Sequence, residues 1–312
     1  MSIEEAYSIE FEEIMDAEKA YELFWEGEIK DKTAFNCIFC GAGVTCANLD
    51  KERAEMVNLP HFKCPNGHNE NCDLIIGENN KTKGNKDGKK KSFINEDIDE
   101  LKIIPNILGV KKVNPSNLNE DIRHKVSKRE KSINEYKQGV KKRSKYSSIR
   151  PIISKYKKYE KYGLLKTKHI NVYKDKNDSK KDINISYSDM FINTSETRIN
   201  EVSRYKRIYY GKGVIIKTKN NYIVIFDTGF KKDKSSIKTT FFINTERHLS
   251  QLNNFEQWKS RLESICSNKE KIMVYIYTNQ IKENSYLDKE KNNIEVINLT
   301  LDNIGCFDYR KL

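Results

Sequence analysis

The stretch YKRIYYGKGVIIKTKNNYIVIFD, Tyr205–Asp227, carries the clearest secondary-structure pattern in the chain. Its first part, residues 205–219, is rich in β-branched and aromatic residues, which favours a strand. Asn220 and Asn221 supply a tight turn, because asparagine tolerates a positive φ angle. Residues 222–227 form the return strand. The stretch therefore predicts an antiparallel β-hairpin.

Further elements follow this hairpin. Residues 237–244, IKTTFFIN, predict a third strand, and a helix with one apolar face is expected from its N-cap Thr245 onward. Residues 271–278 and 293–301 predict two more strands. Three antiparallel strands, a helix and two strands resemble the element order of an OB-fold, a small five-stranded barrel. An SH3-like barrel or a small α+β sheet is the alternative.

An OB-fold binds single-stranded nucleic acid by combining basic residues with aromatic side chains on which bases stack. Strand alternation separates an aliphatic core face from a second face that carries such side chains. The residues expected to bind nucleic acid are Lys217, Lys219, Tyr222, Lys238, Phe242, Tyr275 and Tyr277. The competing interpretation is that the tyrosines are ordinary half-buried strand residues, which β-propensity favours.

Positive charge is concentrated in one part of the chain. The protein has 312 residues and a net charge of +12. Residues 81–150 contain 20 Lys and Arg against 9 Asp and Glu, so most of the excess lies there. A stretch of this kind is either a solvated, mobile segment or an arm that binds phosphates.

The composition predicts a cytoplasmic protein. The acidic N-terminus lacks the basic and apolar regions of a secretory signal, and no stretch of 18 apolar residues is present. Seven cysteines, clustered with Cys-x2-Cys spacing, are typical of a reduced protein rather than a disulfide framework. We therefore expect no membrane partner.

The sequence predicts an α+β, multidomain fold. We expect a helix and zinc-binding module at 1–76, a basic low-complexity and helical linker at 77–148, and an OB-like β domain at 149–312, with its helix between strands 3 and 4. Within the first module, apolar residues recur at three- and four-residue steps over 9–26, which predicts an amphipathic helix that Gly27 ends.

Five of the seven cysteines and two histidines lie between positions 37 and 72. A Cys-x2-Cys pair followed by glycine, Cys37 to Gly41, can direct two thiolates at one ion. The chosen second pair is His68 and Cys72, whose spacing places both side chains on one face of a turn. Cys37, Cys40, His68 and Cys72 are thus the predicted zinc ligands. The remaining donors, Cys46, His61 and Cys64, are alternatives for these places.

A structural rather than catalytic zinc ion is expected here. Catalytic zinc keeps three protein ligands and an open position for water. The deaminase pair of His-x-Glu with Pro-Cys-x2-Cys is absent, and so is His-Glu-x2-His. Cys266 and Cys306 are expected to be core residues.

The sequence FNCIFCGAGV followed by LPHFKCPNGHNENC is similar to the N-terminal zinc module of competence protein CoiA-like proteins. The resemblance covers about residues 10–73. It implies a role in DNA processing or uptake, with Cys37, Cys40, His68 and Cys72 as ligands and His61-Phe62 as a packing pair. The nuclease domain that often follows in this family is not apparent, because no Asp…Glu-x-Lys core is present.

These features favour a non-enzymatic nucleic-acid-binding protein, with single-stranded DNA as the preferred ligand. One alternative is a regulatory module that binds other proteins, in which the lysines serve solubility. A second is a DNA-processing nuclease whose active site is not recognised. Burial of Tyr275 and Tyr277 is expected to weaken the nucleic-acid hypothesis.

Overall fold

The structure is a computed structural model that describes residues 3–53, 56–70, 72, 94–103, 130, 142–173, 183–233, 235–250, 252, 255–287 and 293–312. The chain divides into two compact units. Unit 1 contains Met1–Glu52, Met56–Glu100 and Gly109–Lys145, and unit 2 contains Arg53–Glu55, Leu101–Leu108 and Tyr146–Leu312. Most of the predicted linker at 77–148 lies outside the described residues.

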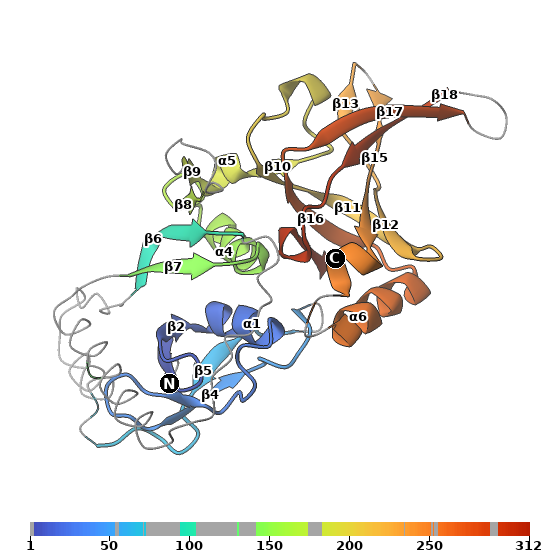
Figure 1. The fold of residues 1–312 in the computed structure, drawn as a ribbon. Helices are drawn as coiled ribbons and strands as arrows, with labels where there is room; N and C mark the ends of the chain where they lie inside the picture. Colours follow the sequence, from blue (N-terminus) through green and yellow to red (C-terminus); the bar gives the residue numbers. More distant parts are fainter. Residues whose placement is uncertain are drawn as a thin grey trace. The chain divides into compact units, whose positions relative to one another are not determined.

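Unit 1 is built on a five-stranded antiparallel sheet with the strand order β2-β1-β3-β4-β5, coloured in shades of blue in Figure 1. Its strands are β1 (Glu5–Ser8), β2 (Ile14–Asp16), β3 (Phe35–Asn36), β4 (Gly43–Ala47) and β5 (His61–Lys63). The strands are short, so the sheet alone encloses little apolar volume. A helix packs on it.

The predicted helix over 9–26 is wrong in its first half. Residues 9–13 form the turn of the β1–β2 hairpin and residues 14–16 form β2. The Ser8 N–H donates to the Glu13 carbonyl, and Glu12 turns the chain at φ 59°. The helix α1 spans Ala17–Trp25 and begins at Asp16, whose carboxylate accepts from the Lys19 N–H at 2.7 Å. Gly27, at φ 80°, ends the helix as predicted.

Helix α1 and the sheet share one core. Ala20, Tyr21 and Leu23 of α1 are buried with Phe35 and Phe62, whose ring centroids lie 5.2 Å apart. Cys37, Cys46 and Cys72 belong to the same cluster. The N-terminal helix therefore packs on the part of unit 1 that carries the clustered cysteines.

Unit 2 is dominated by a mixed sheet with the order β17-β18-β15-β12-β11-β16-β19, and β10 pairs with β11. Its strands are β10 (Phe191–Asn193), β11 (Arg207–Lys217), β12 (Asn221–Phe226), β15 (Lys238–Asn244), β16 (Ile272–Thr278), β17 (Ile281–Leu287), β18 (Asn293–Leu299) and β19 (Phe307–Lys311). The short strands β13 (Lys231–Lys232) and β14 (Ser235–Ser236) form a separate hairpin.

The predicted hairpin is confirmed: β11 and β12 pair antiparallel, with Val214 opposite Ile225. The five expected strands are all present, and a helix lies between the third and the fourth. The closed five-stranded barrel is not found. In the part of the chain that the structure describes, the sheet is open, β17 and β19 end it, and β16 and β18 are not neighbours. Neither end strand, β17 or β19, was predicted from the sequence.

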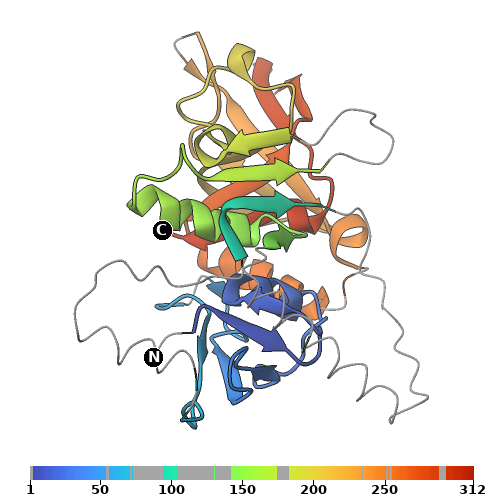
Figure 2. The same ribbon diagram turned by 90° about the vertical axis from the view of Figure 1, so that its left-hand side faces the viewer.

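Two helices pack on the sheet of unit 2 and are visible from two sides in Figures 1 and 2. Helix α4 (Arg150–Lys161) places Tyr156 against Phe191 of β10, with ring centroids 3.9 Å apart. Helix α6 (Phe255–Asn268) buries Trp258, whose ring lies 6.4 Å from that of Phe307. One large apolar core results.

The helix expected from Thr245 onward is divided in two. Thr245–Leu249 form a short π-helix, η4, and α6 begins only at Phe255. The N-cap is Asn244 rather than Thr245, because the Asn244 side chain accepts from the Arg247 N–H at 2.7 Å. Unit 2 also contains two short 3-10 helices, η3 (Ile199–Glu201) and η5 (Ile304–Cys306).

A smaller sheet contains the antiparallel strands β8 (His169–Val172) and β9 (Ile183–Ser186), followed by the short helix α5 (Tyr187–Met190). The ends of β6 (Ile94–Leu101) and β7 (Lys142–Tyr146) complete its order, β7-β6-β8-β9. The linker predicted at 77–148 was expected to be helical, but its residues 94–101 form a strand. None of the described helices could cross a membrane.

Candidate metal centre

Two turns of unit 1 bring four predicted ligands together. Cys37 and Cys40 lie in the turn between β3 and β4, whereas His68 and Cys72 follow β5. The ligand atoms of these four residues all lie within 4.8 Å of one another. Within the described ranges, this is the one group of three or more Cys, His, Asp or Glu side chains placed to share an ion.

The contacts inside the cluster define its shape. The Sγ atoms of Cys37 and Cys72 are 3.9 Å apart. The Nδ1 atom of His68 lies 3.5 Å from the Sγ of Cys40 and 3.5 Å from the Sγ of Cys72. Nδ1 is therefore the imidazole nitrogen that faces the thiols. The four donors can hold a metal ion.

Backbone hydrogen bonds shape the first turn. The Cys37 N–H donates to the Ala42 carbonyl at 2.8 Å, and the Gly41 N–H donates to the Cys37 carbonyl at 3.0 Å. Gly41 adopts φ 74°, which a residue with a Cβ atom disfavours. This glycine allows the chain to reverse so that both thiols of the Cys-x2-Cys pair point to one side.

The second turn is held in a similar way and is joined to the first. Gly67, at φ 75°, donates its N–H to the Cys64 carbonyl. The Asn69 side chain then donates to the Cys40 carbonyl at 3.0 Å, which links the two ligand-bearing turns directly. Sequence reasoning did not select Asn69, because one asparagine in a turn-rich stretch gives no signal of a distant partner.

The three alternative donors have other contacts. The Cys64 thiol donates to the Gly67 carbonyl at 2.8 Å. Cys46 is buried on β4, opposite Phe62 in the β4–β5 pair. His61 directs Nδ1 to the Leu59 carbonyl at 2.8 Å. None of them belongs to the four-residue cluster, so the geometry favours the ligand set chosen from the sequence.

The thiols of the Cys-x2-Cys pair have opposite electrostatic surroundings. Burial raises the pKa of Cys37 to about 12. Burial opposes ionisation of Cys40 as well, but hydrogen bonds from the backbone of Ala42 and Asn69 and from His68 lower its pKa to about 6. Cys40 is therefore the thiol best prepared to meet a cation as a thiolate. A bound divalent ion would favour ionisation of the others.

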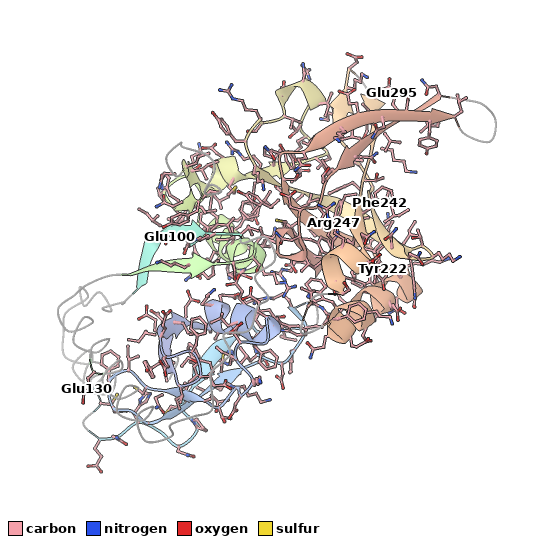
Figure 3. The ribbon with its side chains drawn as sticks, in the orientation of Figure 1. Glu100, Glu130, Tyr222, Phe242, Arg247 and Glu295 are labelled. Atoms are coloured by element: carbon pink, nitrogen blue, oxygen red, sulfur yellow. The ribbon has the colours of Figure 1, made fainter. Side chains whose placement is uncertain are left out.

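The seven residues predicted to bind nucleic acid do not form one surface. Tyr222, Tyr275 and Tyr277 are buried in the core of unit 2. The Lys217 ammonium lies 2.6 Å from the Glu263 carboxylate on α6. Lys219, Lys238 and Phe242 are exposed, and Figure 3 labels Phe242 on β15 and Tyr222 on β12. The interpretation of the tyrosines as ordinary strand residues fits their burial.

Comparisons with known proteins give no relative: no family model, no curated protein and no solved structure matches the chain.

Proposed function

We propose that the Cys37, Cys40, His68 and Cys72 cluster holds a structural zinc ion. Zn–S bonds of about 2.3 Å and Zn–N bonds of about 2.0–2.1 Å in a tetrahedron imply S–S separations of about 3.8 Å and S–N separations of about 3.5 Å. The observed 3.9 Å and 3.5 Å agree with these values. Three sulfur donors and one imidazole nitrogen also match zinc chemistry.

The presence of four protein donors supports a structural rather than a catalytic role for the ion. They fill the tetrahedron and leave no position for the water molecule that a catalytic zinc ion requires. Cys37 and Cys72 are buried, whereas Cys40 and His68 are half-buried. The similarity to the CoiA-like zinc module remains a proposal that rests on the same four ligands.

We further propose that the protein binds nucleic acid without chemical turnover, with single-stranded DNA as the favoured ligand. The observation that carries this proposal is the net charge of +12. Exposed Lys219 and Lys238 add to it, because neither forms an ion pair within the described residues. Neutralising DNA phosphates with lysines releases counterions and drives binding. We place the protein in the cytoplasm, since none of its seven cysteines forms a disulfide.

The arrangement of unit 2 supports an open, OB-like sheet as part of the proposal. The five expected strands run in the order β18-β15-β12-β11-β16, and β15 and β18 are parallel. An OB-fold is a partly open five-stranded barrel. The two additional end strands distinguish this sheet from the minimal form.

A binding titration tests the nucleic-acid proposal. A fluorescein-labelled single-stranded oligodeoxynucleotide is titrated with the full chain at several salt concentrations, and fluorescence anisotropy gives Kd. The affinity is expected to fall steeply as salt rises, with a log–log slope of about −0.7 for each phosphate neutralised. Absence of binding at low salt, or a Kd independent of salt, contradicts the proposal. The same titration with duplex DNA and RNA determines the preference.

A protein-binding module is the second candidate. It is favoured by the burial of Tyr275 and Tyr277, which removes two of the aromatic residues expected to stack with bases. Under this candidate the lysines serve solubility, and the salt-dependent titration shows no binding.

A further inference from the structure

One face of the β11-β12-β15 sheet carries apolar side chains that are exposed or half-buried. Cross-strand pairing places Ile216, Ile223 and Phe242 in one row, and Val214 and Ile225 in the next. Ile216 is 47% exposed and Phe242 is 48% exposed. We call these five residues the outer row cluster. Adjacent exposed apolar side chains on a folded protein mark an interaction site more often than isolated ones do.

The outer row cluster continues a face that a helix covers elsewhere. Tyr210, on the same side of β11 as Val214 and Ile216, directs its hydroxyl to that of Tyr156 on α4 at 3.4 Å. α4 thus covers this face over β10 and the first half of β11. Apolar sheet faces are stable when a second layer covers them. The outer row cluster is therefore a surface beside α4 on which a second helix could pack.

Lysines without ion pairs surround the outer row cluster. Lys212 and Lys238 lie on the same face, one row beyond Val214 and Ile225, and Lys219 lies in the β11–β12 turn. None of the three forms an ion pair within the ranges that the structure describes. Lys217 and Lys271 differ, since Lys217 pairs with Glu263 and Lys271 pairs with Asp227.

We propose that the outer row cluster binds an acidic amphipathic helix of a partner protein. The apolar side of that helix would pack on the aliphatic rows, and its carboxylates would meet Lys212, Lys219 and Lys238. Four of the five residues in the cluster are aliphatic, and only Phe242 offers a ring on which a base could stack. The composition of the cluster therefore favours a polypeptide over nucleic acid at this face, and the partner helix would share Lys219 and Lys238 with the phosphates of the proposed nucleic-acid ligand.

The chain's own basic segment fits this site poorly. Residues 117–145 contain 10 Lys and Arg against 4 Asp and Glu, so they would bring positive charge to a lysine rim. A partner with carboxylates beside its apolar stripe has the complementary charge, which speeds encounter and fixes orientation.

Peptide titrations with the full chain test the proposal. The probe is a fluorescein-labelled 18-residue peptide with Leu and Phe at i, i+3, i+4 and i+7 and with Asp and Glu elsewhere. A peptide of identical composition in scrambled order keeps the charge and removes the apolar stripe. The patterned peptide is expected to bind at least about tenfold more tightly than the scrambled one.

Variants locate the binding surface. Ile216→Ala with Phe242→Ala is expected to weaken peptide binding at least about tenfold, whereas Tyr286→Ala, at a similarly exposed aromatic residue on β17, leaves it unchanged. Lys212→Gln with Lys238→Gln is expected to weaken it about two- to fivefold. The matched control is Lys271→Gln, which changes a lysine that forms an ion pair with Asp227. Circular dichroism verifies the fold of each variant.

Four results would overturn the proposal or assign the face to another ligand. Equal affinity for the two peptides, or unchanged peptide affinity in the Ile216→Ala, Phe242→Ala variant, overturns the proposal. Parallel titration of the Ile216→Ala, Phe242→Ala variant with the oligodeoxynucleotide separates the two functions, because Phe242 is also one of the residues expected to bind nucleic acid. Weakened peptide binding with retained oligonucleotide binding assigns the face to the peptide. Loss of oligonucleotide binding in that variant assigns the face to nucleic acid. Sedimentation that shows a dimer which the double variant dissociates assigns the face to self-association.

Discussion

Removing zinc should destabilise unit 1 and leave unit 2 folded. The ion would join the Cys37–Cys40 turn to the segment that carries His68 and Cys72. Unit 1 has the smaller core, and three of the four ligands, Cys37, Cys40 and Cys72, lie in or against it. No ligand belongs to the core of unit 2. A chelator of high zinc affinity is therefore expected to act on one unit only.

The size of the effect follows from the loop that the ion closes. Cys40 and His68 bound a closed loop of about 29 residues. Treated like a disulfide crosslink, closing this loop contributes about 3.6 kcal/mol through the entropy of the unfolded chain. Zinc–ligand bonding adds to that, since structural zinc contributes about 10–16 kcal/mol of apparent binding free energy at pH 7. A domain stability of about 5–15 kcal/mol does not survive a loss of this order.

The chain's two tryptophans provide one reporter for each unit. Trp25 is buried in unit 1 and Trp258 in unit 2. Urea titrations followed by fluorescence are run on Trp258→Phe and on Trp25→Phe, with and without chelator. For an m-value of about 2 kcal/mol/M, the loop term alone lowers the Trp25 midpoint by about 2 M. The Trp258 midpoint should not change.

Two controls identify the ligands. Cys72→Ser should reproduce the chelated behaviour, whereas Cys64→Ser should keep the response of the parent to chelator. A shift of the Trp25 midpoint by less than about 0.5 M on chelation, or an equal shift of both midpoints, refutes a structural zinc site confined to unit 1. Metal analysis of the purified chain should give one zinc per molecule.

Three further outcomes are expected from single changes. Gly41→Ala places a Cβ atom at φ 74° and should lower the unfolding free energy of unit 1 by about 1–2 kcal/mol, read from Trp25. Phe241→Ala empties a fully buried position and should cost unit 2 about 3–5 kcal/mol, read from Trp258. Burial lowers the pKa of His248 below 6.5, and its Nδ1 accepts from the Asn244 N–H, so unit 2 should lose stability as pH falls below about 6.5. His248→Gln should flatten that dependence between pH 7 and pH 5, and an unchanged slope contradicts it.

The sequence identified the metal cluster because its information is local. Cys-x2-Cys with a following glycine specifies one turn, and His68 and Cys72 are close enough in sequence to share another. The β11–β12 hairpin was also predictable, since the β-branched and aromatic residues of both strands favour it over short distances. Its turn runs from Thr218 to Asn221, so Asn221 belongs to β12 rather than to a two-residue turn with Asn220. The boundaries of α1 were less predictable, because a side-chain cap at Asp16 and a turn at Glu12 override the apolar periodicity before them.

Burial on the sheet could not be predicted in the same way. Alternation showed that Tyr275 and Tyr277 share one face of β16, but not that this face is covered. Tyr275 stacks on Tyr210, and Tyr210 meets Tyr156 of α4, a helix more than a hundred residues earlier in the chain. The open sheet has the same origin, since β17 and β19 join it through pairings that neither strand's own sequence specifies.

The sequence by itself thus indicated the four side chains that could share a metal ion, the five central strands and the excess of positive charge. Tertiary structure decided which aromatic residues are accessible and which apolar face remains open. The physical reason is that ligand spacing and strand alternation depend on neighbours within a few residues. Coverage of a sheet face depends instead on where distant helices pack.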